Sequence, residues 1–176
     1  MSVITVTAGH SNKDPGAVNG LFREADIAQE MRNMVALYLR QKDIAVKTDG
    51  EGKGNLPLPD AIKLISGSKA AVEFHCNAFS KPSAGGCEAL SQPKDRALSQ
   101  RLCKAVSDVM GIPTRGTDGG WKNEGSGQHS RLGYVRNGGI ILELFFISNP
   151  TELAVWQDKK WLVAKAVAEV LAEVAA

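Results

Sequence analysis

The chain has 176 residues, of which 43% are hydrophobic and 23% charged, and its 21 Lys and Arg nearly balance its 19 Asp and Glu at a formal net charge of +2. This composition excludes intrinsic disorder, and the length predicts one domain over residues 1–176 whose core is large enough to fold without disulfides or metal. The mild charge, with no Lys/Arg run longer than two, argues against a nucleic-acid partner.

Alternating strand and helix patterns run along the chain, separated by glycine-rich and polar turns. In chain order we expect a strand at 2–7, a helix at 24–40, a strand at 44–48, a helix at 59–66, strands at 70–75 and 87–90, a helix at 93–110, a strand at 140–146 and a helix at 161–174. Segment 111–139 holds nine of the eighteen glycines and is expected to be a long, functional loop. The alternation predicts an α/β domain with a mostly parallel sheet.

The cysteines and the N-terminal residues indicate the cellular compartment of the protein. Cys76, Cys87 and Cys103 are odd in number and form no C-x-x-C pair, which is typical of reduced thiols in a cytosolic protein. Residues 1–7 lack the basic region of a signal peptide, and their apolar stretch is too short for one. No stretch of the chain approaches the 18 apolar residues that a transmembrane helix needs. We therefore expect a cytoplasmic protein that does not insert into a membrane.

Two of the three histidines are expected at one edge of the sheet. His10 follows the first predicted strand, His75 ends the third, and Glu143 lies near the end of the last. Since open α/β sheets bind ligands beyond the carboxyl ends of their strands, these three side chains should lie close together. The third histidine, His129, falls in the glycine-rich segment and is expected in a loop.

Glu24 joins this group by a separate argument. It shares a helix face with Ile27, Ala28 and Met31, so it lies on the stripe that faces the core. Burial of a carboxylate is unfavourable unless it is paired or binds a metal, and the helix N-terminus favours the charge by only about 0.3–1 kcal/mol. A cation is the simplest further stabiliser.

Two imidazoles and one carboxylate form a ligand set of catalytic zinc sites, which leave a fourth position for water. A hydrolase also needs a carboxylate that is not a ligand, and Glu143, alone in an apolar run, suits that role because desolvation raises the pKa of a carboxyl group. Each residue has an ordinary alternative explanation: a hydrogen-bonded histidine, a glutamate at a helix start, a charge that protects an edge strand. Their joint occurrence favours a metal site, and these patterns leave the substrate open.

Three local motifs resemble one family. The opening Thr7-Ala8-Gly9-His10, then Lys13-Asp14-Pro15-Gly16-Ala17 and Glu24, is similar to that of the zinc-dependent N-acetylmuramoyl-L-alanine amidases of the amidase_3 family. Phe74-His75-Cys76-Asn77-Ala78 resembles the second histidine motif of that family. Leu142-Glu143 with Phe146-Ile147-Ser148-Asn149-Pro150 resembles its catalytic glutamate motif. The motifs stand in the family's order over nearly the whole chain.

This resemblance implies a three-layer α/β/α fold with a central mixed, mostly parallel sheet. It also implies that His10, Glu24 and His75 bind Zn²⁺ and that Glu143 is the catalytic acid/base. The implied reaction is hydrolysis of the amide between N-acetylmuramic acid and L-alanine in peptidoglycan. Residues 132–137 resemble the segment before the family's last strand, which would bring Arg136 near the site.

The chain departs from the family pattern at three positions. Ser11 and Phe145 each replace a common glycine, and Glu73 stands where a small serine is common. Because alternate strand residues share a face, Glu73 and Asn77 should lie beside His75, where Glu73 would either orient the imidazole or serve as an ordinary structural carboxylate. Glu73, Asn77 and Arg136 are therefore expected to support the metal-binding residues or to contact the substrate.

The expected protein is a monomeric endolysin of the phage type, made in the bacterial cytoplasm and passed through the inner membrane by a separate lysis protein. The rivals are a zinc carboxypeptidase or aminopeptidase acting on wall peptides, and a wall-binding domain without catalysis. A further alternative uses the same zinc with Cys87 and two of the three histidines as ligands.

Overall fold

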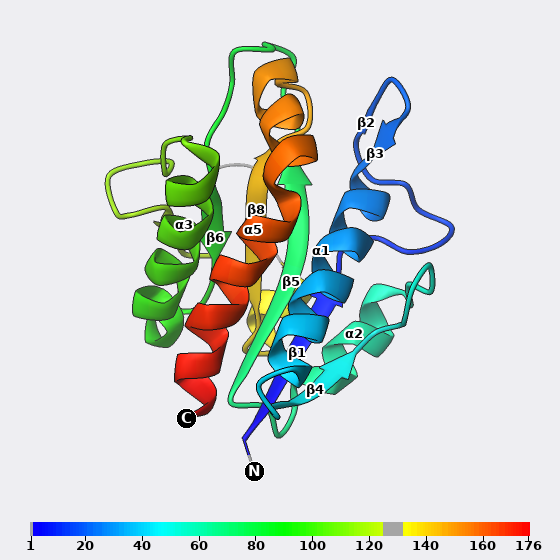
Figure 1. The fold of residues 1–176 in the computed structure, drawn as a ribbon, viewed down its shortest axis with the longest axis vertical. Coiled ribbons are helices and arrows are strands. Elements are labelled where there is room, and N and C mark those ends of the chain that lie inside the picture. The colour runs from blue at the N-terminus through cyan, green and yellow to red at the C-terminus, as the bar shows by residue number, and fades with distance from the viewer. Residues whose placement is uncertain (1, 125–131) are drawn as a thin grey trace.

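A computed structural model describes residues 2–124 and 132–176, and Figure 1 shows their arrangement. Expected helices and strands form at nearly every predicted place. The elements are β1 (Val3–Ala8), β2 (Val18–Asn19), β3 (Phe22–Arg23), α1 (Glu24–Arg40), β4 (Ala45–Thr48), α2 (Leu58–Ile65), β5 (Ala70–Asn77), β6 (Glu88–Leu90), the 3-10 turn η1 (Pro93–Asp95), α3 (Arg96–Met110), β7 (Trp121–Lys122), α4 (Gly133–Arg136), β8 (Ile140–Phe146) and α5 (Pro150–Ala175).

The central sheet has the order β4-β1-β5-β8-β6-β7. The first four strands in this order run parallel, β6 is antiparallel to β8, and β7 is parallel to β6. The predicted mixed, mostly parallel sheet is therefore confirmed. The parallel strands bring the ends of β1, β5 and β8 to one edge, which is where the histidines were expected.

Helices cover both faces of the sheet. Helices α1, α3 and α5 lie on one face (in front of the sheet in Figure 1) and enclose the larger core, which includes Ile27, Leu102 and Trp156. Helices α2 and α4 pack on the other face around a smaller core with Ala61 and Tyr134. The α/β fold and its layered arrangement are confirmed. No helix within the described ranges has the length and apolar character needed to cross a membrane.

The last helix begins at Pro150, eleven residues before its predicted start at 161. Asn149 caps it, since its side chain accepts hydrogen bonds from the backbone N–H groups of Thr151 and Glu152 at 3.0 and 3.2 Å. The early turns bury Trp156, whose ring stacks on Phe145 at 5.5 Å between centroids. The predicted bounds were wrong because the Asn-Pro pair was assigned to a turn that ends the strand.

Segment 111–139 is not a single loop as predicted. It contains β7, which pairs with β6, and the short α4. The hairpin of β2 and β3 was also missed. Strands of two residues have no measurable periodicity, so hydrophobic pattern gives no signal for them. The expectation for His129 falls outside the described residues.

Candidate active site

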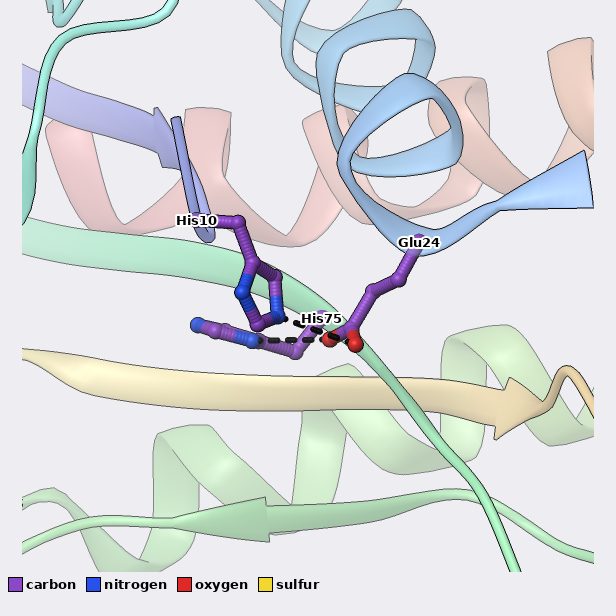
Figure 2. A group of neighbouring side chains, drawn as sticks. All are labelled: His10, Glu24 and His75. Atoms are coloured by element: carbon purple, nitrogen blue, oxygen red, sulfur yellow. Dashed lines mark hydrogen bonds and ion pairs between the residues drawn. The ribbon is translucent and has the colours of Figure 1, made fainter. Parts of the chain in front are cut away.

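The structure brings His10, Glu24 and His75 together (Figure 2). His10 lies just after β1, Glu24 is the first residue of α1, and His75 is near the end of β5. Glu24 Oε2 lies 2.9 Å from His10 Nε2, and Glu24 Oε1 lies 3.0 Å from His75 Nδ1. One donor atom of each side chain lies within 4.8 Å of the others, so the three can coordinate one metal ion.

The backbone around this group permits unusually close approach. A Cβ on Gly9 would lie 2.3 Å from the His75 ring, and one on Gly16 would lie 2.5 Å from His10 Nε2. His10 itself has a φ of 66°, in the left-handed region that side chains other than glycine rarely adopt. Strain of this kind tends to be retained at functional sites.

Each imidazole is held at its other nitrogen by a second carboxylate. Asp14 Oδ2 lies 2.9 Å from His10 Nδ1, and Glu73 Oε1 lies 3.0 Å from His75 Nε2. Glu73 is buried and also lies within reach of the Thr7 hydroxyl at 3.4 Å. Carboxylates placed this way fix the ring orientation of metal-binding histidines. The sequence argument anticipated Glu73 but missed Asp14, although it follows His10 by four residues in the same turn-rich segment.

The charges of the group are strongly coupled. Burial acts to lower the pKa of His10, but Glu24 and Asp14 outweigh it and raise that pKa. The pKa of His75 is raised well above its usual value because Glu24 and Glu73 overcome a similar burial effect. For Glu24, burial acts to raise the pKa, but the hydrogen bonds from both histidines hold it far below its usual range. A metal cation would therefore meet an ionised carboxylate and displace protons from the imidazoles.

Glu143 lies beside this group on the adjacent strand. It is buried, and it is paired in register with His75 across the parallel strands β5 and β8. Paired residues on neighbouring strands project from the same face, at a strand spacing of about 4.8 Å. The charge of Glu143 contributes to the raised pKa of His75, in keeping with this closeness.

The remaining predicted site residues lie farther out. Asn77 donates from Nδ2 to Glu88 Oε1 at 3.0 Å rather than to the histidine group. Arg136 ends α4, before β8 begins, and its guanidinium pairs with Glu124 at 2.6 Å. This position is at the amino end of β8, whereas Glu143 lies toward the carboxyl end, so a role for Arg136 stays a prediction.

A cavity of about 400 Å³ opens beside the histidines. The start of α2 forms one wall, and the lining residues are His10, Ser11, Asp14, Pro57, Leu58, Pro59, Glu73 and His75. Cys87, considered as an alternative ligand, is fully buried in the larger core, and burial raises the pKa of its thiol. Among the described residues, Cys87 does not belong to the group of side chains that could hold a metal ion.

The comparison with protein families decides the class of protein. The model of the N-acetylmuramoyl-L-alanine amidase family (Amidase_3) matches residues 4–173. The chain belongs to the N-acetylmuramoyl-L-alanine amidase family. The amidase described from Neisseria meningitidis is 54% identical, with a TM-score of 0.90 over 98% of this chain and 94% of that one.

Other solved structures share the fold at lower identity. The catalytic domain of the amidase CwlV from Bacillus (Paenibacillus) polymyxa var. colistinus is 22% identical, with a TM-score of 0.80 over 98% of this chain and 97% of that one. The amidase AmiC2 of Nostoc punctiforme is 18% identical, with a TM-score of 0.84 over 98% and 96%. No curated protein matches significantly.

These findings identify the amidase as an enzyme of peptidoglycan hydrolysis. They favour the amidase interpretation over the peptidase and the non-catalytic wall-binding domain. The assignment to the amidase_3 family made from three short motifs is confirmed, and it covers the same span of the chain.

Proposed function

We propose that this amidase is a zinc enzyme in which His10, Glu24 and His75 bind the ion and Glu143 moves the proton. The observation that carries the proposal is the convergence of these three side chains within 4.8 Å, with Glu143 in register beside His75. The substrate is the amide that joins the lactyl group of N-acetylmuramic acid to L-alanine of the stem peptide.

The donor set fits zinc. Two imidazole nitrogens and one carboxylate oxygen are ligands that catalytic zinc sites use, with one position kept for water. Asp14 and Glu73 hold the two rings so that His10 Nε2 and His75 Nδ1 both face Glu24. Gly9 and Gly16 leave the room that these rings occupy. Bound zinc would lower the pKa of water to about 7 and stabilise charge on a carbonyl oxygen.

The chain's own residues complete the reaction. Water attacks the lactyl carbonyl carbon, a C–O bond forms, and the C–N bond to alanine breaks. The Glu143 carboxylate takes a proton from the attacking water and delivers it to the alanine nitrogen, which leaves as an amine. Burial of Glu143 keeps bulk water from competing for this proton.

The first test is metal content. Purified protein should hold one zinc per chain by elemental analysis, and removal of the zinc by a chelator should abolish amide hydrolysis until zinc is restored. His75→Ala should lower zinc binding by more than the roughly 10- to 100-fold that loss of an outer hydrogen-bond partner costs, because one of three ligands is removed.

A cysteine variant is the control for this test. Cys87→Ala should keep one zinc per chain, since Cys87 is buried in the larger core between the sheet and helices α1, α3 and α5. Full zinc content in His75→Ala, or loss of zinc in Cys87→Ala, would contradict the assigned ligands.

We also propose that the amidase acts as an endolysin, held in the bacterial cytoplasm until a separate protein opens the inner membrane. Support comes from the shared fold of the catalytic domain of the CD27L endolysin, which is 17% identical with a TM-score of 0.69 over 99% of this chain and 97% of that one. Bacteria that express the amidase alone should stay intact and should lyse within minutes once a pore-forming membrane protein is induced. Lysis without the pore-forming protein would instead indicate export and refute this role.

A further inference from the structure

A second group of charges lies on the far side of Glu143 from the histidines. In the sheet, His75 on β5 pairs with Glu143 on β8, and Glu143 pairs with Glu88 on β6. The three side chains therefore project from one face as a row, with Glu143 in the middle. Whatever surrounds Glu88 borders the reacting bond on the side opposite the metal-binding residues.

Glu88 holds two cations at this position. Its side chain is only 2% exposed, and Oε2 accepts from Arg115 Nε at 2.8 Å and from Lys122 Nζ at 2.5 Å. Asn77 donates to the other oxygen. The buried carboxylate of Glu88 thus holds the side chains of Arg115 and Lys122 in place.

Both cations reach the surface beside Glu88. The side chains of Arg115 and Lys122 are 34% and 28% exposed. The Arg115 guanidinium lies 4.7 Å above the ring of Phe146, the last residue of β8, which places it at the carboxyl end of the strand that carries Glu143.

The hydrogen bonds of the two cations leave donors for a ligand. Arg115 Nη1 donates to the carbonyl of Gly85 at 2.9 Å. A guanidinium and an ammonium carry eight N–H donors between them, and in the described part of the chain Glu88 and Gly85 accept three. An arginine and a lysine fixed side by side are suited to bind a carboxylate.

The chemistry of the substrate says which part carries that carboxylate. On the glycan side the lactyl carboxyl group is already consumed in the scissile amide, and an N-acetylated sugar is neutral. The peptide side carries at least the carboxylate of its own C-terminus. An anion near the reacting bond therefore belongs to the peptide.

We propose that Arg115 and Lys122 form a subsite that binds a free carboxylate of the stem peptide during amide hydrolysis. The inference rests on the proposed function, because it takes Glu143 as the group at the reacting bond. It sets the direction of the substrate: the peptide lies over β6 and β7, and the glycan lies toward the cavity walled by Pro57, Leu58 and Pro59.

The test compares two muramoyl peptides of one sequence, one with free carboxyl groups and one with every carboxyl group converted to a primary amide. Hydrogen bonds to a charged group contribute about 1.5–3 kcal/mol, so wild-type protein should favour the free acid in kcat/KM by about 10- to 100-fold. Lys122→Gln should lower kcat/KM for the acid and bring the ratio of the two substrates close to one. Lys104→Gln, which removes an exposed lysine paired with Asp108 on α3, is the matched control and should leave the ratio unchanged.

Each outcome decides the matter. A wild-type ratio near one overturns the subsite without any variant, so a Lys122→Gln protein that fails to fold does not block the test. An equal loss on both substrates in Lys122→Gln, with the ratio kept, also overturns it, because that is the pattern of a purely structural role. If wild-type protein cleaves neither substrate, the proposed function itself is refuted, and this result differs from the equal cleavage of both substrates that refutes the subsite alone.

Discussion

Glu143→Gln is expected to lower kcat for amide hydrolysis by about 100- to 10,000-fold, the range that a positioned general acid/base contributes. The glutamine side chain has nearly the shape of the glutamate carboxylate, but it cannot take a proton from water and pass it to the alanine nitrogen. Zinc content should stay at one per chain, because Glu143 is not one of the three side chains proposed to bind zinc. The measurement is the rate at which purified peptidoglycan releases new alanine amino groups, together with elemental analysis.

Glu73→Gln is the contrast that makes this result specific. Glu73 is also a buried carboxylate on the same sheet face, but it contacts His75 Nε2 rather than the reacting bond. Its loss should weaken zinc binding by about 10- to 100-fold, with activity largely restored by excess zinc. If excess zinc also restored Glu143→Gln, or if that variant kept wild-type kcat, the assignment of Glu143 would be wrong.

The parts of the site that sequence could predict are those fixed by regular structure. His10, His75 and Glu143 follow or end strands with a clear apolar pattern, and parallel strands bring their carboxyl ends to one edge. Glu24 could be placed because helix periodicity puts it on the buried stripe. These arguments need only repeat lengths of 2 and 3.6 residues, which the sequence displays directly.

The parts that could not be predicted depend on tertiary pairing. Lys122 reaches Glu88 because β7 pairs with β6, and Arg115 reaches it because its backbone N–H donates to the carbonyl of Cys87, the residue before β6. The strand at 87–90 was predicted, but its direction and its neighbours were not. The two-residue β7 has no periodic signal and lies in glycine-rich sequence that indicates a loop. Asp14 reaches His10 across a turn in which His10 itself has a left-handed backbone. Such contacts follow from backbone geometry that residue types do not specify.

Arg32→Met is expected to destabilise the fold by about 3–5 kcal/mol at neutral pH, because it leaves the Asp49 carboxylate buried without its counter-ion. Both side chains are fully buried, with Arg32 Nη1 3.0 Å from Asp49 Oδ1. Asp49 also accepts a hydrogen bond from the backbone N–H of Ala8 at 3.2 Å, so the pair supports the end of β1 that leads to His10. Urea unfolding should show a lower midpoint with an unchanged slope.

The effect should depend on pH in a defined direction. Burial raises the pKa of Asp49 to about 6, and the Arg32 charge opposes this rise. Without Arg32 the folded-state pKa climbs further, while the unfolded value stays near about 3.9. When folding raises the pKa of a carboxyl group, the free energy of unfolding falls as the pH rises from the unfolded-state pKa to the folded-state pKa. In Arg32→Met this pH range is wider than in wild type, so the total fall in stability is larger. The deficit of Arg32→Met should therefore be smaller at pH 5 than at pH 8.

Arg40→Met provides the matched control, since Arg40 lies on the same helix and pairs with Glu51 in the same loop at 2.7 Å. That pair is largely exposed, with side chains 45% and 65% accessible, so its loss should change stability by less than about 1 kcal/mol. Equal losses in the two variants would mean that burial adds nothing to the Arg32–Asp49 pair. A deficit that shrinks from pH 5 to pH 8 would mean that Asp49 does not carry the uncompensated charge.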